Sequence, residues 1–357
     1  MKKHYNIPIF ITHSGCKNDC VFCNQKIITG QPESSGEKEI RATIEKFIDI
    51  IYDRIDNNCN NCNNYNNFVG TEIAFFGGSF TGLEKSEMIK FLEIANEYID
   101  KYKIISGIRL STRPDYISRE ITGILLKYRV KSVELGIQSM FDDVLFACKR
   151  GHTVEDTIRA CGIIKSAGIN LTGQMMLGLP GSDRNRDIET AEMLVNLGVN
   201  AARIYPTVIL KGTQLYDLYK NGGYAPLSLD EAVFRAKEIK KIFDKNNIEI
   251  LRMGLCSSDI KESDIVAGAY HPAFGELAES EIIYDMLAEE IENYKGACAV
   301  IIRANKKNIS KIVGHKRKNI ERLKEKFAIR EIKIIEDKDE DNNINLYKLY
   351  ITEITER

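Results

Sequence analysis

The sequence predicts an α/β protein: a partial (βα)6 TIM-like barrel followed by a small α+β C-terminal domain. Short apolar runs alternate with helix-like segments between Ile7 and Met253, which is the pattern of parallel βα units. We count six such units, with a last strand over 248–253 as the seventh, too few for a closed eight-stranded barrel. The residues after Ala297 differ in charge and in the order of their predicted elements.

The bulk composition indicates an ordinary globular protein. The 357 residues are 43% hydrophobic and 28% charged, with a formal net charge of −1, which suits one large and one small domain. There is no signal-peptide pattern at the start and no apolar stretch of membrane-spanning length. We therefore expect a cytoplasmic protein with no membrane partner, whose nine cysteines are more often metal ligands than disulfides.

The first predicted strand, 7–11, leads into the stretch I-T-H-S-G-C-K-N-D-C-V-F-C-N, where Cys16, Cys20 and Cys23 have C-x3-C-x2-C spacing. Thiolates suit zinc, copper(I) or iron–sulfur clusters, and a closed zinc site takes four ligands. Three cysteines without a close fourth indicate a [4Fe-4S] cluster with one iron left open. A zinc loop, or three unrelated buried cysteines, is the alternative.

An insertion follows the predicted helix 36–52. Residues 57–67 are nearly all asparagine, and such a polar tract cannot bury enough apolar surface to order itself. Cys59 and Cys62 within it have C-x2-C spacing. A second metal site and simple compositional drift are both open interpretations of this segment.

Regular alternation returns after the insertion. We expect strands over 72–76, 107–111, 132–137, 170–177, 201–208 and 248–253, and helices over 85–102, 116–128, 141–148, 154–167, 186–197 and 229–246. Active sites of parallel barrels lie at the carboxyl ends of the strands. The residues just after each strand are therefore the functional candidates.

Glycine and polar residues stand at several of these strand ends. Paired glycines let the backbone approach a ligand closely, and an arginine can bind a carboxylate through two parallel hydrogen bonds. The candidates for binding a cofactor are Gly77, Gly78, Ser111, Gln138, Arg150 and Gln174.

The cysteine spacing, with Phe22 before the last cysteine, resembles the radical S-adenosylmethionine (SAM) superfamily. That resemblance implies a partial barrel of the radical SAM type, with the [4Fe-4S] cluster on Cys16, Cys20 and Cys23. The amino and carboxylate groups of SAM would chelate the open iron. An electron from the cluster would then split the sulfonium and yield a 5′-deoxyadenosyl radical.

The same resemblance implies roles for the strand-end residues. The backbone of the glycine pair would meet the amino group of SAM, Gln138 and Gln174 would meet the ribose, and Arg150 would bind the carboxylate. Ser79 stands where the superfamily carries the acid of a G-G-E-like motif, which still leaves backbone contacts available.

A narrower resemblance covers about residues 7–253. The motifs E-L-G-I-Q-S from Glu134, R-G-H-T from Arg150, M-M-L-G-L-P from Met175, and I-Y-P-T with K-G-T-Q-L-Y from Ile204 are together similar to the radical SAM portion of the Elongator catalytic subunit. That family modifies the wobble uridine of tRNA. The cysteine spacing looks more like the oxygen-independent coproporphyrinogen oxidase type. We expect no acetyltransferase domain after this region.

We divide the chain into a radical SAM core, 1–254, a connector, 255–294, and a small domain, 295–357. His271 in the connector is interpreted as structural. The small domain has predicted strands over 297–303, 329–335 and 346–351, and predicted helices over 307–313 and 318–327.

The loop between the two tail helices, G-H-K-R-K, resembles the G-x-x-G loop of the K homology (KH) module, which clamps single-stranded nucleic acid. Arg317 replaces the second glycine. Residues 303–330 contain eleven Lys and Arg against two Glu, the charge footprint expected for phosphate contact. The predicted RNA contacts are Gly314, Lys316, Arg317 and Lys318, and a solvated pair of amphipathic helices is the alternative.

The sequence thus predicts a radical SAM enzyme that modifies tRNA or another RNA and takes electrons from a donor such as ferredoxin or flavodoxin. Two other classes stay open. One is a radical SAM enzyme acting on a small molecule or peptide, with the tail used for dimerisation. The other is a non-catalytic RNA-binding protein with a structural metal loop.

Overall fold

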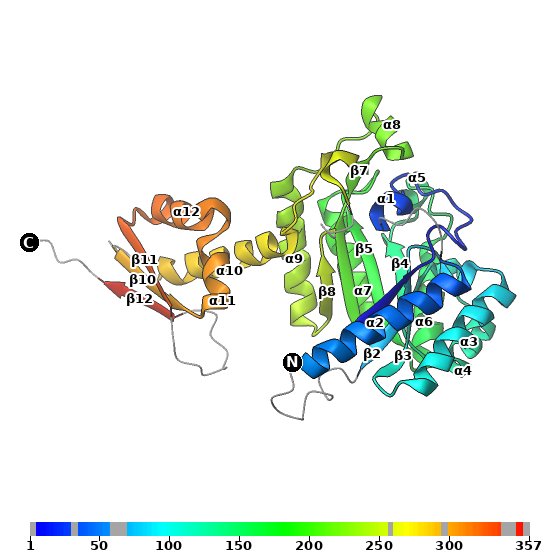
Figure 1. The fold of residues 1–357 in the computed structure, drawn as a ribbon. Helices are drawn as coiled ribbons and strands as arrows, with labels where there is room; N and C mark the ends of the chain where they lie inside the picture. The colour runs from blue at the N-terminus through cyan, green and yellow to red at the C-terminus, as the bar shows by residue number, and fades with distance from the viewer. Residues whose placement is uncertain are drawn as a thin grey trace, which may run out of the picture.

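A computed structural model describes residues 5–29, 35–57, 70–255, 260–293, 299–336 and 348–352. Its main element is a curled, seven-stranded parallel sheet (Figure 1). In spatial order the strands are β1 (Asn6–Phe10), β2 (Thr71–Phe76), β3 (Ile105–Thr112), β4 (Val130–Gln138), β5 (Asn170–Leu177), β6 (Ala201–Pro206) and β8 (Glu249–Met253). The predicted partial barrel is confirmed, and the expected seventh strand is β8.

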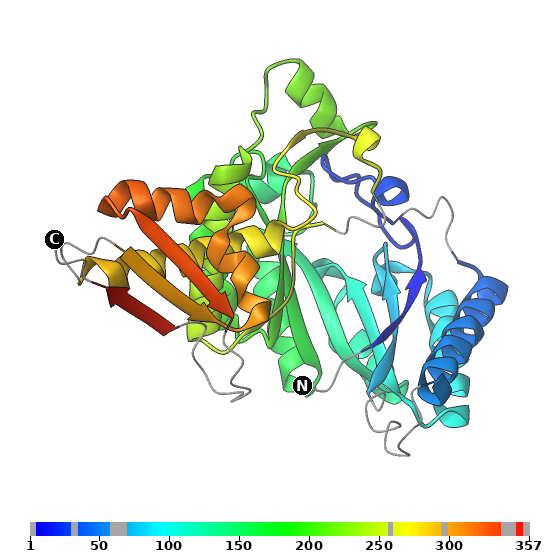
Figure 2. The ribbon, with the colours of Figure 1, turned by 60° about the vertical axis from the view of Figure 1, so that its left-hand side comes forward.

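Helices cover the outer face of this sheet (Figures 1 and 2). They are α2 (Glu37–Asn57), α3 (Lys85–Lys101), α4 (Arg119–Lys127), α6 (Val154–Ser166), α7 (Arg184–Leu197) and α9 (Leu229–Lys245). The short helix α5 (Asp142–Ala147) instead lies at the cysteine loop, where Val144 shares an apolar cluster with Cys20 and Val21. The apolar core lies between sheet and helices, because alternate strand residues such as Ile7 and Ile9 are fully or almost fully buried together with Ile40 and Ile44 of α2. The opposite strand face, left free, forms the inside of the barrel.

Several element boundaries differ from the sequence prediction for local reasons. The strand expected over 201–208 ends at Pro206, which has no N–H for the ladder. The chain continues as β7 (Val208–Leu210), which pairs antiparallel with β9 (Ile265–Gly268). The helix expected from Tyr116 begins at Arg119, because the Ser118 hydroxyl caps it.

Two short helices were not predicted. Helix α1 (Gln25–Thr29) follows the cysteine loop, and α8 (Gln214–Lys220) begins where the Thr213 hydroxyl accepts a hydrogen bond from the Tyr216 N–H. Ile27 and Ile28 of α1 pack with a cluster formed by β7 residues and Ile260. Ile28 and Ile260 of this cluster also line the pocket described below.

The C-terminal part forms a second sheet with its own core. Its elements are β10 (Ala299–Ala304), α11 (Lys306–Val313), α12 (Lys318–Phe327), β11 (Glu331–Glu336) and β12 (Lys348–Thr352), after the long helix α10 (Phe274–Glu292). The central strand β10 runs parallel to β11 and antiparallel to β12. Ile283, Leu287 and Ile291 of α10 belong to this second core, so α10 joins the two units physically (Figure 2). The small α+β domain is therefore as expected.

None of the helices in the described ranges has the length and apolarity needed to cross a membrane. Cys59 and Cys62 lie outside the described residues.

Candidate functional site

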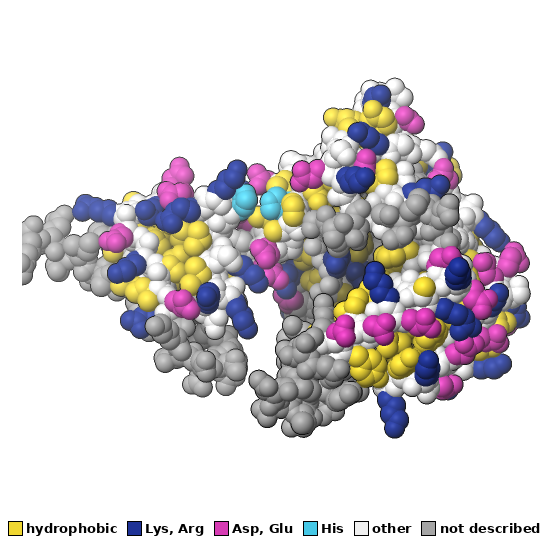
Figure 3. Space-filling model, in the orientation of Figure 1, with side chains coloured by type: hydrophobic (Ala, Val, Ile, Leu, Met, Phe, Trp, Pro, Cys, Tyr) yellow, Lys and Arg dark blue, Asp and Glu magenta, His cyan; other side chains and the backbone are white. Residues whose placement is uncertain are grey.

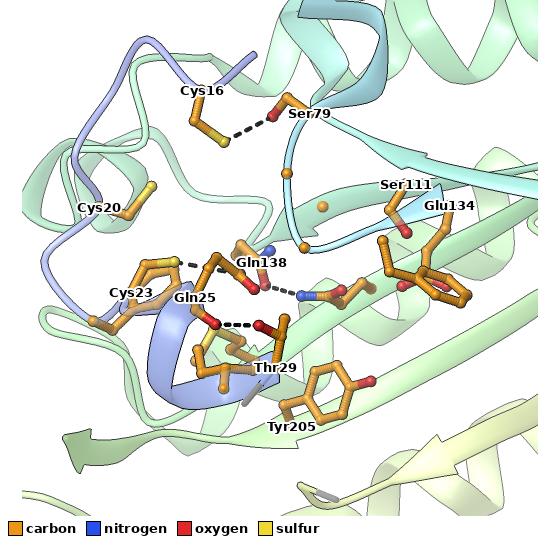
Figure 4. A pocket seen from close by; sticks show the side chains of 18 of the residues that line it. Cys16, Cys20, Cys23, Gln25, Thr29, Ser79, Ser111, Glu134, Gln138 and Tyr205 are labelled. Carbon is orange, nitrogen blue, oxygen red and sulfur yellow. Dashed lines mark hydrogen bonds between the residues drawn. The ribbon is translucent and has the colours of Figure 1, made fainter. Parts of the chain in front are cut away.

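A pocket of about 560 Å³ opens at the carboxyl ends of the sheet strands. The structure brings to it every residue that the sequence singled out for a cluster and a cofactor. These are Cys16, Cys20, Cys23, Gly77, Gly78, Ser111, Gln138, Arg150 and Gln174. They come from the loop after β1, the ends of β2 to β5, and the segment after α5. Residues far apart in sequence therefore share one cavity, with the three cysteines along one side of the close-up and Ser111, Glu134 and Tyr205 along the other (Figure 4).

Each cysteine of the loop lies beside a polar side chain, and for Cys16 and Cys20 that side chain comes from a distant segment of the chain. Cys16 Sγ lies 3.2 Å from Ser79 Oγ, and Cys23 Sγ accepts a hydrogen bond from the Gln25 side chain at 3.4 Å. Cys20 Sγ lies 3.2 Å from Nη1 of the buried Arg150. Hydrogen bonds to cysteine sulfurs tune the properties of a bound cluster. Ser79, which replaces an expected acid, thus contacts a cysteine.

The candidate metal ligands at this end of the pocket are cysteine sulfurs, which are soft ligands. Burial first, and then the neighbouring Cys20 charge, raise the pKa of Cys23 to about 12, so metal binding would have to displace its proton. His13 lies close by, but its Nε2 already accepts the Gln25 N–H at 3.0 Å. Across the described ranges, no three His, Cys, Asp or Glu side chains are grouped closely enough to hold a metal ion. Three thiols with a guanidinium beside them fit an iron–sulfur cluster better than a zinc ion.

The cofactor candidates include polar atoms whose hydrogen-bonding capacity is unused. Ser111 Oγ and Arg150 Nε are buried and have no hydrogen-bond partner among the described residues. Gln138 ends β4 with a left-handed φ of 70°, at a break in the β4–β5 register, and its Oε1 accepts from Gln174 Nε2 at a long 3.4 Å. Unused polar atoms and backbone strain are typical of a site shaped for a ligand. The chemistry and placement of these residues fit SAM.

Positions 77 and 78, directly after β2, require glycine for two different structural reasons. Gly77 has φ = 85°, which favours glycine. A Cβ on Gly78 would lie 2.4 Å from the Ile11 carbonyl oxygen and 2.5 Å from that of Ser14. Gly78 therefore lets the β2 end fit directly beneath the cysteine loop, and the requirement for glycine there comes at least partly from this loop.

The family of the chain follows from its similarity to known proteins. Residues 10–194, more than half of the chain, match the Radical SAM superfamily. The chain belongs to the radical SAM superfamily. Residues 199–284 match the Radical_SAM C-terminal domain. The protein is therefore a radical SAM enzyme with the α/β fold of that superfamily, as its cysteine spacing predicted.

Within this superfamily, the chain is similar to proteins named for tRNA modification and for the Elongator complex. A tRNA uridine(34) acetyltransferase of Methanocaldococcus jannaschii is 34% identical over 171 residues, which are 47% of this chain and 31% of that protein. Elongator complex protein 3 of Saccharomyces cerevisiae is 37% identical over 130 residues, 36% of this chain and 23% of that protein. The matched region is thus about a third or less of these relatives. The structure of Methanocaldococcus infernus Elp3 with an N-terminal deletion shares the fold, with a TM-score of 0.62 at 23% identity, covering 80% of this chain and 64% of that one.

The K-G-T-Q-L-Y motif of this radical SAM chain lies against the cysteine loop. Leu215 N–H donates to the Val21 carbonyl at 2.7 Å, and Gln214 Nε2 donates to Asp19 Oδ2 at 3.0 Å. Lys149 Nζ donates to Gln214 Oε1 at 2.5 Å. The start of α8 therefore holds the cysteine loop on both sides of Cys20, through one backbone and one side-chain hydrogen bond. The sequence alone did not predict this contact.

Replacing Gln214 by leucine should loosen this loop and weaken retention of the cluster. Partners outside the ligand set commonly change metal affinity by about 10-fold, and we expect a loss of that order in resistance to an iron chelator. The measurement is the half-time of iron loss from the reconstituted protein. Asp217→Asn, an exposed change on the same helix, is the control, and equal half-times for the two variants would contradict the role of Gln214.

The predicted RNA-binding residues lie in the second unit, outside the pocket. Lys316 and Arg317 have left-handed φ values of 52° and 64° and are exposed. Gly314 packs against Asn319, where a Cβ would approach to 2.8 Å. Lys318 Nζ instead lies 2.8 Å from Asp230 Oδ1 at the start of α9. Lys and Arg side chains gather on the upper surface of this unit, where Figure 1 places α12 (Figure 3).

The same loop contacts the connector. The rings of His271 and His315 lie edge to face with centroids 5.2 Å apart. Together with the Lys318–Asp230 ion pair, this contact places the basic loop beside the start of α9. Helices that follow parallel strands begin at the carboxyl edge of the sheet, so the loop lies on the side of the molecule where the pocket opens.

Proposed function

We propose that this radical SAM enzyme cleaves S-adenosylmethionine reductively and uses the resulting 5′-deoxyadenosyl radical to modify tRNA or another RNA. The observation that carries the proposal is the convergence of the nine predicted residues on one pocket. The matched relatives support the substrate class, since they are named as a tRNA uridine(34) acetyltransferase and an Elongator protein. The exposed basic loop before α12 supports it independently.

Cys16, Cys20 and Cys23 would hold the [4Fe-4S] cluster. When bound, the reduced cluster supplies the electron that splits the SAM sulfonium, and an external donor such as ferredoxin or flavodoxin would replenish it. Arg150 lies at Cys20 and has a buried Nε without a hydrogen-bond partner among the described residues, which supports a role in binding the SAM carboxylate beside the cluster.

The remaining side chains would position the cofactor and exclude water. The amides of Gln138 and Gln174, which contact one another only weakly, would turn to bind the ribose hydroxyls, and the Ser111 hydroxyl would gain a partner. Ile28 and Ile260, which belong to one apolar cluster, give the pocket an apolar lining, which would limit the quenching of a radical by solvent.

The test is the yield of 5′-deoxyadenosine from the anaerobically reconstituted and reduced protein, with and without tRNA that lacks modifications. We expect the yield to rise when the tRNA is present, because substrate binding completes the site in enzymes of this kind. A single-stranded DNA of equal length is the control for nonspecific polyanion effects. Cleavage that ignores tRNA would overturn the RNA assignment and favour a small molecule or peptide, and no cleavage with an intact cluster would overturn the reaction.

A further inference from the structure

Two arginines lie side by side on the pocket wall. Arg203 of β6 and Arg252 of β8 are paired residues in the parallel ladder, and both line the pocket. Like charges directly opposite on neighbouring strands destabilise a sheet. An arrangement of this kind inside a barrel needs negative charge nearby, from the protein or from a ligand.

The described residues supply only part of that charge. Arg203 Nε donates to Glu134 Oε2 at 2.8 Å, and both side chains are mostly buried. Arg203 Nη1 also donates to the Tyr205 hydroxyl at 3.3 Å. Among the described residues no carboxylate or hydrogen-bond acceptor pairs with Arg252. Glu134 therefore pairs with Arg203, and the positive charge of Arg252 has no paired carboxylate within the described ranges.

The other pocket arginines differ from Arg252 in this respect. Arg113 makes two hydrogen bonds to Asp115, and Arg150 bonds the Gly136 carbonyl and contacts Cys20. Arg252 is therefore distinct as a half-buried cation that lines the pocket without a partner in the described part of the chain.

This charge lies away from the proposed place of the SAM carboxylate. In Figure 4 Glu134 and Tyr205, the two side chains that contact Arg203, face the pocket from the side opposite the cysteines. Arg150, by contrast, contacts Cys20. The pocket thus presents two separate cationic positions, and a single carboxylate on the cofactor accounts for only one of them.

We propose that Arg252, with Arg203 beside it, binds a phosphate group of the substrate. Guanidinium pairs match phosphate oxygens through parallel charged hydrogen bonds, and one phosphodiester carries the single negative charge that this wall lacks. Resting on the proposed function, the phosphate is that of an RNA nucleotide inserted into the pocket, as enzymes that act on a base must unstack it first. A free phosphate ester shares this chemistry and is distinguished below.

The experiment is chemical labelling of the full-length, reconstituted protein with phenylglyoxal, followed residue by residue by mass spectrometry. Inorganic phosphate and a uridine trinucleotide are the two probes. A bound ligand slows labelling by the factor 1 + [L]/Kd, so we expect about 10-fold slower labelling of Arg252 at ten times the Kd of either probe. Arg119, an exposed arginine on α4, is the internal control and should label at an unchanged rate.

The outcomes separate this inference from the proposed function. Protection of Arg252 by the trinucleotide at lower concentration than by phosphate supports an RNA phosphate. Protection by phosphate alone would keep the anion site and overturn its assignment to RNA. Protection by neither probe would overturn the inference, and it would do so even if tRNA stimulates 5′-deoxyadenosine formation, because that assay does not depend on which residue holds the phosphate.

Discussion

Replacing Cys20 by alanine should abolish both cluster binding and SAM cleavage. Cys20 is the most buried of the three loop cysteines, and removing it leaves two thiolates, too few to hold a cubane cluster. Loss of a residue on which the whole reaction depends commonly lowers the rate by about a thousand-fold or more, and we expect no less here. Iron and sulfide per polypeptide, the electron paramagnetic resonance signal of the reduced protein and the yield of 5′-deoxyadenosine measure the effect.

Cys161→Ala is the matched control for this prediction. Cys161 is also buried, but it lies in α6 within the main apolar core, where loss of its sulfur should cost only about 1 kcal/mol. The variant should keep its cluster. Cys148 packs in the same apolar cluster as Cys20, so a cluster that survives in Cys20→Ala would contradict the assigned ligand set and point to Cys148 as a substitute.

The location of the pocket could be predicted from the sequence because it depends on topology. Once the strands are known to be parallel, their carboxyl ends must meet at one edge. Gly77, Ser111, Gln138 and Gln174, each at or near the end of a different predicted strand, therefore had to approach one another. The structure places all four in one pocket, while their individual contacts with SAM remain predictions.

Features that depend on long-range pairing could not be predicted. Arg203 and Arg252 read as charged residues within apolar strands, and their adjacency requires the β6–β8 register, which shifts between Ala202 and Arg203. Pairing with β9 likewise turns the chain after Pro206 into a separate strand, where local composition suggested continuation. The sequence offered one signal for these two arginines: a charged residue inside an otherwise apolar strand needs a partner, from the protein or from a ligand.

The C-terminal unit also contains a long-range contact that the sequence could not predict. Periodicity predicts the order of its helices and strands, but charge and spacing alone put Lys318 in one RNA-binding loop with Lys316 and Arg317. The ion pair with Asp230, 88 residues away, connects Lys318 to the radical SAM core instead. Lys316 and Arg317 are therefore the two residues of this loop whose substitution should weaken RNA binding.

Neutralising Lys316 and Arg317 together, as the Lys316→Gln/Arg317→Gln double variant, should strongly weaken RNA binding. Each phosphate contact with a single strand contributes a slope of about −0.7 in log K against log salt. Two lost contacts therefore predict a slope shallower by about 1.4, and an affinity roughly 70-fold lower at about 0.05 M salt than that of the unchanged protein. Fluorescence anisotropy of a labelled single-stranded RNA over a salt series measures both quantities on the full-length protein.

The matched control carries the same loss of charge on the larger unit. Lys38 and Lys46 are exposed lysines of α2, and their double replacement by glutamine changes net charge equally without touching the loop. The loop variant should lose affinity and salt slope together, because lost phosphate contacts change both, whereas the α2 variant should change neither by more than about two-fold. Equal effects in the two variants would show that RNA responds only to the overall charge, and the loop would then be a solvated surface rather than a binding site.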